Sequence, residues 1–291
     1  MLARDRGRKS IKVSERFDSL LFFLAASMSV TAIATICVFL IAEGLPVIQK
    51  TGLNGLVLSE IWRPSEGKFG LLPMILGTVY VTSFAALIAV PIGVLTAAFM
   101  AKLCPLWLYK IFKTAISVLA SIPSVVYGFF GLVTVAPMSR NLFGGEGTSM
   151  LSASLVLALM MLPTVTIVSE SAIRAAAEES YHSALALGID KVRSLFFVVL
   201  PSAKKGIASA AALGIARAVG ETTAVMMVSG NQARMPQSLL KGVRTITANI
   251  ALEIGYAADE HRSALAASAL LLFAAVLSVN ILIGILERRK R

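Results

Sequence analysis

The sequence predicts an all-α membrane protein with six membrane-spanning helices and both termini in the cytoplasm. Of its 291 residues, 57% are hydrophobic and only 15% are charged, with a mean hydropathy of +0.81. This composition is far too apolar for a soluble domain of the same length. Six apolar runs are long enough to cross a bilayer. The basic residues are concentrated in every second segment between these runs.

The expected spans are residues 19–42, 70–100, 114–136, 150–168, 208–230 and 263–286. A basic tail (1–18) and a basic end (287–291) flank this six-helix domain (19–286). Eighteen of the 27 lysines and arginines lie in the two ends and in the loops after the second and fourth spans, against eight in the three opposite segments. The positive-inside rule therefore places the ends and these two loops in the cytoplasm.

The first apolar run has two interpretations. A cleaved signal peptide would also begin with a basic segment followed by an apolar one. The run is longer than the apolar core of such peptides, and no small-residue cleavage site follows it. We therefore expect an uncleaved first helix. The loop after it carries Trp62, which we expect to anchor at the membrane interface.

Prolines interrupt two of the expected spans. Pro91 is expected to kink or break the second span. In the third, Pro123 interrupts the backbone hydrogen bonds where Ser124 and Tyr127 supply polar groups. A break at membrane depth survives only where protein or water satisfies the freed backbone groups. The Pro123 break is therefore a candidate for the substrate pathway, and a purely structural kink is an equally good interpretation.

The fifth span carries the oppositely charged pair Arg217 and Glu221, followed by Thr222. Charged residues at bilayer depth are costly and are usually paired or functional. On one continuous helix these two side chains would project from the same face, four residues apart, and could pair. We expect an anion pathway in which Arg217 attracts the anion and Glu221 competes for the arginine. A buried ion pair that only fixes helix packing is the alternative.

Residues 178–201 form a long cytoplasmic loop with helical periodicity on both sides of Gly188. We expect a short amphipathic helix, a turn at Gly188 and a second helical run. Such a segment suits docking into a groove on a cytoplasmic partner, and an interfacial helix without a partner is the alternative. The candidate coupling residues are His182, Ser183, Ala184, Gly188, Leu200 and Pro201.

The sequence lacks the motifs that are typical of several classes of enzyme and metal-binding protein. The chain contains no phosphate-binding G-x-x-x-x-G-K-[ST] loop, no metal-ligand cluster and no nucleophile–base pattern. The net charge of +11 is concentrated between the apolar runs, which indicates membrane topology rather than nucleic-acid binding. The two cysteines, Cys37 and Cys104, are poorly placed for a disulfide. We therefore expect a transport subunit with no enzyme activity and no bound cofactor of its own.

The loop and three other stretches resemble a known family. The 182–201 frame is similar to the EAA loop of ABC-transporter permeases, although His182 occupies the glutamate position. The stretches LLPMILGTVYVTSFAALIAVPIG (71–93), IPSVVYGFFGL (122–132) and ARAVGETTAV (216–225) resemble phosphate-specific permeases of the PstC type. The resemblance covers about three quarters of the chain. It implies the fold of an ABC importer type I permease.

The resemblance also implies a function and an assembly. The chain would form half of the pathway of a phosphate importer in a bacterial inner membrane. Its partners would be a second permease subunit of the PstA type, an ATPase dimer that binds the ATP, an extracytoplasmic phosphate-binding protein, and membrane lipid. In the family, the membrane arginine and glutamate that match Arg217 and Glu221 are associated with phosphate translocation. A permease for sulfate or molybdate, and a membrane sensor or scaffold for phosphate signalling, are the alternatives.

Overall fold

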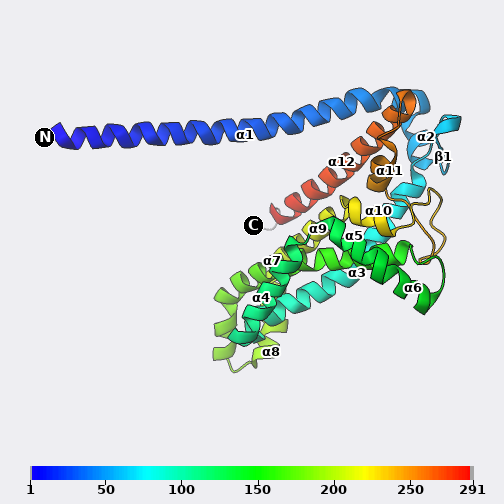
Figure 1. Ribbon diagram of the computed structural model, residues 1–291. Helices are drawn as coiled ribbons and strands as arrows, with labels where there is room; N and C mark the ends of the chain where they lie inside the picture. The colour runs from blue at the N-terminus through cyan, green and yellow to red at the C-terminus, as the bar shows by residue number, and fades with distance from the viewer. Residues whose placement is uncertain (1, 289–291) are drawn as a thin grey trace.

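The computed structural model describes residues 2–288 and consists almost entirely of helices, as predicted (Figure 1). The long helices are α1 (Leu2–Thr51), α3 (Leu72–Ala98), α7 (Met150–Ala186), α9 (Leu200–Val219) and α12 (Asp259–Arg288). A small hairpin of β1 (Trp62–Arg63) and β2 (Lys68–Phe69) follows α2 (Leu53–Leu58), with the 3₁₀ turn η1 (Pro64–Glu66) between the strands. In the described residues, five helices are long and apolar enough to cross a membrane, and a bent helix pair would be the sixth.

The first, second, fourth and sixth expected spans fall on α1, α3, α7 and α12. Helix α3 passes through Pro91 as one helix and continues into the π-helical segment η2 (Phe99–Leu103). Helix α7 begins at Met150, as predicted, because the Ser149 side chain accepts a hydrogen bond from the Ser152 N–H. It then extends well beyond the expected span and includes Tyr181, at the start of the segment expected to form a separate amphipathic helix.

The third expected span, over 114–136, falls on a bent helix pair rather than on one straight helix, because the chain turns sharply at Pro123. Helix α4 (Leu106–Ser121) ends there, and α5 (Ser124–Phe130), η3 (Gly131–Val135) and α6 (Ala136–Phe143) continue at a bend of 96°. Ile122 is extended, with φ −65° and ψ 127°. A residue that precedes proline is disfavoured in the helical region, so the break occurs at Ile122. The expected interruption at Pro123 is thus confirmed.

The fifth span also differs from the prediction. One continuous helical stretch runs through α8 (Lys191–Ser194), the π-helical segment η4 (Leu195–Val199) and α9. It ends at Val219, and a separate short helix, α10 (Thr223–Val228), follows after a break at residues 220–222. The span is therefore residues 191–219 rather than 208–230. A short helix outside the candidate spans, α11 (Ile246–Glu253), begins after Thr245, whose side chain caps it.

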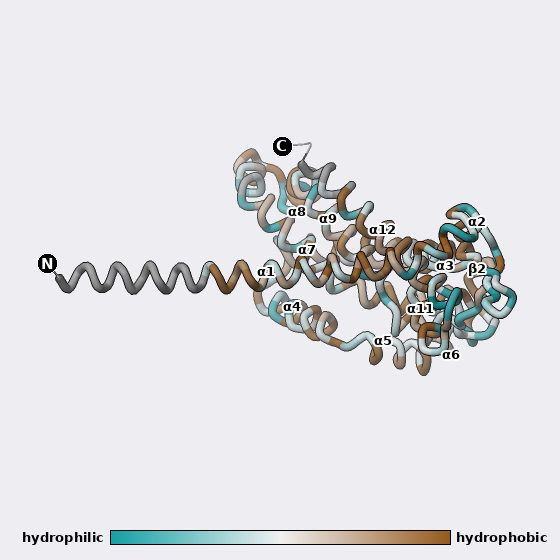
Figure 2. Tube along the Cα trace, turned by 90° about the horizontal axis from the view of Figure 1, so that it is seen from above, coloured by the Kyte–Doolittle hydropathy of each residue, from teal (hydrophilic) through white to brown (hydrophobic). Residues whose placement is uncertain are grey.

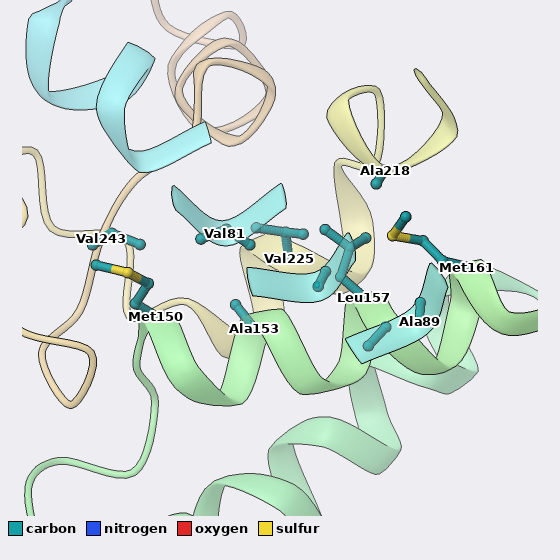
Figure 3. Close-up of a cluster of buried hydrophobic side chains, with 11 residues drawn as sticks. Val81, Ala89, Met150, Ala153, Leu157, Met161, Ala218, Val225 and Val243 are labelled. Atoms are coloured by element: carbon teal, nitrogen blue, oxygen red, sulfur yellow. The ribbon is translucent and has the colours of Figure 1, made fainter. Parts of the chain in front are cut away.

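Helices α3, α7, α9 and α10 form the centre of the molecule. Figure 3 shows buried side chains that converge from α3, α7, α9 and α10, with Val243 from the segment before α11. Many of them are small or unbranched residues, which allow helices to approach closely where lipid provides no hydrophobic driving force between them. This core holds α7 between α3 and α9.

Helix α1 contacts the rest of the chain mainly near its C-terminal end and extends away from the core elsewhere (Figures 1 and 2). Its contact with α12 is close at Gly44. A Cβ atom at this position would lie 2.9 Å from both the Cα and the N of Ala267. The backbone of α12 cannot yield as a flexible side chain would. Gly44 therefore sets how closely α1 and α12 pack.

We expect Gly44→Val to separate α1 from α12 and to destabilise their packing by about 1–3 kcal/mol, as overpacking does. Disulfide crosslinking between Val47→Cys and Ala264→Cys, two buried core residues of α1 and α12, would report the contact. The crosslinking yield should fall in the Gly44→Val background. Gly284→Val is the matched control, because a Cβ there meets no atom within 4 Å. Equal yields in both backgrounds would contradict the close contact.

Candidate functional site

Two helix breaks lie on elements that pack against each other. One separates α4 from α5 at Pro123, and the other separates α9 from α10 at residues 220–222. Helix α5 packs directly on α10. A Cβ at Gly128 of α5 would lie 2.6 Å from the Met227 Sδ and 3.0 Å from the Ala224 Cα of α10. The glycine therefore permits the close approach of these two short helices after each break.

Arg217 lies in the last turn of α9, just before the second break, and its side chain is exposed. The guanidinium Nη1 donates a hydrogen bond to the Thr164 Oγ1 of α7 at 2.9 Å. A cation at this end of a helix is also stabilised by the helix dipole. The hydroxyl orients one edge of the guanidinium, and the described residues provide no carboxylate partner for it. This arrangement is suited to receive an anion.

The expected pairing of Arg217 with Glu221 does not occur among the described residues. Helix α9 ends at Val219, so the two residues do not share a helix and the i,i+4 geometry is lost. The Glu221 Oε1 instead accepts a hydrogen bond from the Ala224 N–H at 3.1 Å, at the start of α10. Its backbone carbonyl accepts one from Thr247 Oγ1 of α11 at 3.1 Å. Glu221 therefore stabilises the break.

Thr222 and Tyr127 also satisfy backbone groups at the breaks. The Thr222 Oγ1 donates to the Gly220 carbonyl at 3.3 Å. The buried Tyr127 hydroxyl donates to the Leu119 carbonyl at 2.8 Å, in the last turn of α4. This carbonyl has no i+4 donor, because residue 123 is a proline, and its other partner is the Ile122 N–H at 3.4 Å. The expectation that Tyr127 supplies a polar group to the Pro123 break is therefore confirmed.

The two breaks are connected through α5 and α10, which pack on each other. Tyr127 lies on α5, and Arg217 lies just before the break that leads to α10. Ser124, at the first position of α5, is half-buried. Ser124 thus lies at the start of the same short helix as Tyr127, and Glu221 and Thr222 lie in the backbone break that follows Arg217.

The predicted coupling residues lie on the turn and the two arms of a helical hairpin. Helix α7 extends to Ala186, Gly188 turns the chain with a φ of +82°, and the Asp190 carboxylate caps α8 by accepting from the Val192 N–H. The prediction of a separate coupling helix is therefore wrong, because both arms are the ends of long helices. Gly188 is the turn, as expected.

The individual coupling residues differ in exposure. His182, Ser183, Gly188 and Pro201 are exposed, Leu200 is half-buried, and Ala184 is buried. The tip also presents large apolar side chains, with Leu187 83% and Phe197 78% exposed. These side chains are available to a partner, whereas Ala184 contributes only to packing within the hairpin.

Sequence reasoning missed two polar residues of α7. Thr164, the partner of Arg217, follows Pro163 in an apolar run and was expected only as part of the span. Glu170 was assigned to the loop after the fourth span, but it lies inside α7 with only 2% of its surface exposed. In the sequence, the sign that Glu170 is buried in a helix was a single carboxylate between two apolar helical segments. In the described residues, no group of three or more potential metal ligands occurs.

The chain is similar to known transport proteins over most of its length. Residues 89–291 match the family model described as "Binding-protein-dependent transport system inner membrane component". A probable ABC transporter permease protein of Bacillus subtilis, YqgH, is 36% identical over 241 residues, covering 81% of this chain and 76% of that protein. The phosphate transport system permease protein PstC of Xylella fastidiosa is 32% identical over 289 residues, covering 92% and 89%.

Solved structures have a similar fold. A chain of the methionine ABC transporter MetNI in an inward-facing conformation aligns with 79% of this chain and 99% of its own length, with a TM-score of 0.57 at 18% identity. This likeness concerns the fold alone. Together with the five to six candidate spans, the family match defines the class of the protein. The chain belongs to the family of binding-protein-dependent transport system inner membrane components and is a multi-pass inner-membrane protein.

Proposed function

We propose that this chain is a permease subunit of an ATP-driven phosphate importer and forms half of its translocation pathway. The observation that carries the proposal is the exposed Arg217 guanidinium, which is held by Thr164 beside two helix breaks. The PstC phosphate permeases that resemble the chain over most of its length support phosphate as the substrate. The chain itself is a transport subunit and catalyses no reaction.

The site suits a phosphate anion chemically. A guanidinium offers forked donors that match the oxygens of a tetrahedral oxyanion, and charge-assisted bonds of this kind are short and strong. Thr164 occupies only Nη1, so the anion can use other donors of the group. Ser124 and the Tyr127 hydroxyl are further polar groups along the path, and Glu221 and Thr222 hold the break open beside it. Glu221 limits the affinity through its negative charge in the break.

The assembly follows from the same proposal. The subunit pairs with a second permease of the PstA type, an extracytoplasmic phosphate-binding protein delivers the anion, and membrane lipid surrounds the spans. An ATPase dimer binds and hydrolyses the ATP, and this chain binds no cofactor. The hairpin tip at Gly188 docks on the ATPase through its exposed apolar side chains. Motion of the ATPase then tilts α7 and the α8–α9 helix, which together hold Thr164 and Arg217.

The substrate is tested by ATP-dependent uptake of labelled phosphate into proteoliposomes that contain the whole complex with its binding protein. We expect unlabelled arsenate, which is tetrahedral and similarly protonated, to inhibit uptake, whereas excess sulfate does not. Omission of ATP is the control and should abolish uptake. Inhibition by sulfate as strong as that by unlabelled phosphate would instead identify a broader oxyanion permease.

A further inference from the structure

A polar stripe runs along α4 between the Pro123 break and the predicted cytoplasmic side. Lys113, Ser117 and Ser121 are spaced four residues apart and so share one face of the helix, with Thr114 beside them. They line a groove of about 390 Å³ together with Val118. At 1.5 Å per residue, the stripe extends about 12 Å from Lys113 to Ser121. It therefore leads directly to the break that holds Ser124 and Tyr127.

At the Lys113 end, the stripe meets a cluster of charged side chains around Glu170. The Lys113 Nζ lies 3.0 Å from Glu170 Oε2, and the Arg174 Nε lies 2.8 Å from Glu170 Oε1. The Tyr109 hydroxyl also donates to Oε1 at 2.9 Å. The carboxylate is buried, whereas the side chains of Lys113 and Arg174 are 43% and 42% exposed. The exposed part of the cluster is therefore cationic.

The two cations are not held equally. Arg174 also donates through Nη2 to the Met100 carbonyl of η2 at 2.9 Å, and its guanidinium lies over the Tyr109 ring at 4.8 Å. Lys113 has one ion pair in the described structure, with Glu170. It is the cation that can turn toward the groove, because Arg174 and Tyr109 would continue to bind Glu170 Oε1 and Arg174 would still balance the charge of the carboxylate.

We propose that this groove is a second oxyanion site, between Arg217 and the cytoplasm, in which Lys113 and the Ser117 hydroxyl bind the phosphate as it leaves. This inference rests on the proposed function and extends it to the exit path. Charge-assisted and hydroxyl hydrogen bonds match the oxygens of a phosphate dianion. Glu170 competes with the anion for Lys113, so the site holds phosphate weakly and releases it. A helix of the partner permease packed on the hydroxyls is the outcome that would exclude the site.

The test uses cysteine accessibility in the whole complex, reconstituted without nucleotide. Cys37 and Cys104, the two free cysteines of the chain, are replaced by serine, and Ser117→Cys is introduced. The thiol is then modified with a negatively charged or a positively charged methanethiosulfonate. We expect the negative reagent to react faster, after correction for the reactivity of a free thiol in solution. We also expect inorganic phosphate to slow the reaction.

Matched variants connect the result to the proposed residues. Lys113→Gln should reduce the preference for the negative reagent by about fivefold, which is the scale of one solvent-exposed ion pair. It should also remove the protection by phosphate. Ala115→Cys is the control, since it is exposed on another face of α4 and does not line the groove. It should show neither the charge preference nor the protection.

The possible outcomes separate the inference from the proposed function. A complex that imports phosphate while Ser117→Cys is unreactive, or is not protected by phosphate, would overturn the exit site and leave the importer intact. Protection by sulfate but not by phosphate, in a complex that imports sulfate, would support the site and overturn phosphate as the substrate. Protection by phosphate that Lys113→Gln removes, in a complex that imports phosphate, would support both.

Discussion

Replacing Arg217 with glutamine is expected to lower ATP-dependent phosphate uptake by about 10- to 100-fold. A hydrogen bond to a charged group contributes about 1.5–3 kcal/mol, and each 1.4 kcal/mol corresponds to about a factor of ten. Glutamine keeps a hydrogen-bond donor within reach of Thr164 but removes the charge and the forked geometry. The measurement is the initial rate of labelled phosphate uptake into proteoliposomes at several concentrations of loaded binding protein.

Two control variants assign the effect to the charge. Thr164→Val removes the hydrogen bond to Nη1 and keeps the guanidinium, so uptake should fall only about fivefold, the value of one ordinary hydrogen bond. Arg217→Lys keeps the charge without the fork and should give an intermediate rate. Size-exclusion chromatography must show that each complex still contains its ATPase. If the Arg217→Gln complex takes up phosphate at the wild-type rate, the arginine has only a packing role. The candidate pathway would then be the Pro123 break with Ser124 and Tyr127.

The sequence predicted the helices that depend on local signals and missed the contacts that depend on tertiary structure. Ser149 and Thr245 are local helix caps, and both helices begin where these residues indicate. Pro123 ends α4 through its effect on Ile122, which is also local. The bend of 96° that follows is set by the packing of α5 on α10, for which the sequence contains no pattern.

The charged pair shows why part of the candidate site could not be predicted. A helical pattern over 208–230 favoured pairing of Arg217 with Glu221, since both would lie on one face. The helix ends at Val219, and the Glu221 carbonyl just beyond it is bound by Thr247, a residue 26 positions further along the chain. The motif resemblance depends on residue identity and spacing rather than on helix continuity, so Arg217 and Glu221 stay the predicted pathway residues although they do not pair.

The polar stretch after the fourth span was misjudged for a related reason. Its second arm, Lys191–Val199, was expected to be a helical run within the cytoplasmic loop, separate from a fifth span at 208–230. The π-helical turn η4 precedes Pro201 within one continuous helix. A wider turn relieves the clash between the proline ring and the preceding carbonyl groups. The hairpin tip is consequently attached to Arg217 by one helix, which gives the proposed coupling a direct mechanical route.

The largest effect on stability is expected for Glu253→Leu. Glu253 lies where the β1–β2 hairpin, α11 and the start of α12 meet. The Glu253 carboxylate is buried and accepts from Trp62 Nε1 at 2.9 Å, Arg244 Nη1 at 2.6 Å and His261 Nε2 at 2.8 Å. Trp62 is thus a buried residue of this cluster rather than the exposed interface anchor expected from the sequence. Its buried indole N–H needs this acceptor.

Leucine would remove an acceptor shared by three donors. Arg244, whose side chain is only 18% exposed, would keep its hydrogen bonds to Asn231 and Asn249 but lose its negatively charged partner. Removing one partner of a buried ion pair costs about 3–5 kcal/mol, since the remaining charge stays desolvated. For a chain of this size, about 3 kcal/mol corresponds to a fall in Tm of about 6–12 °C. Thermal denaturation of the purified complex, followed by tryptophan fluorescence, measures this change. The emission of Trp62 should also shift, whereas Trp107, which is exposed on α4, should be unaffected.

Glu260→Gln is the matched control, because Glu260 forms an ion pair with Lys50 in which both side chains are more than half exposed. Pairs of this kind contribute at most about 1 kcal/mol, so Tm should change by less than about 4 °C. Glu253→Gln separates charge from hydrogen bonding. Its amide oxygen can still accept from Trp62, but its amide nitrogen cannot accept from Arg244. A Tm near that of the wild type for Glu253→Gln, with a low Tm for Glu253→Leu, would assign the stability to the hydrogen bonds. Equal losses in both variants would assign it to the negative charge that Arg244 requires.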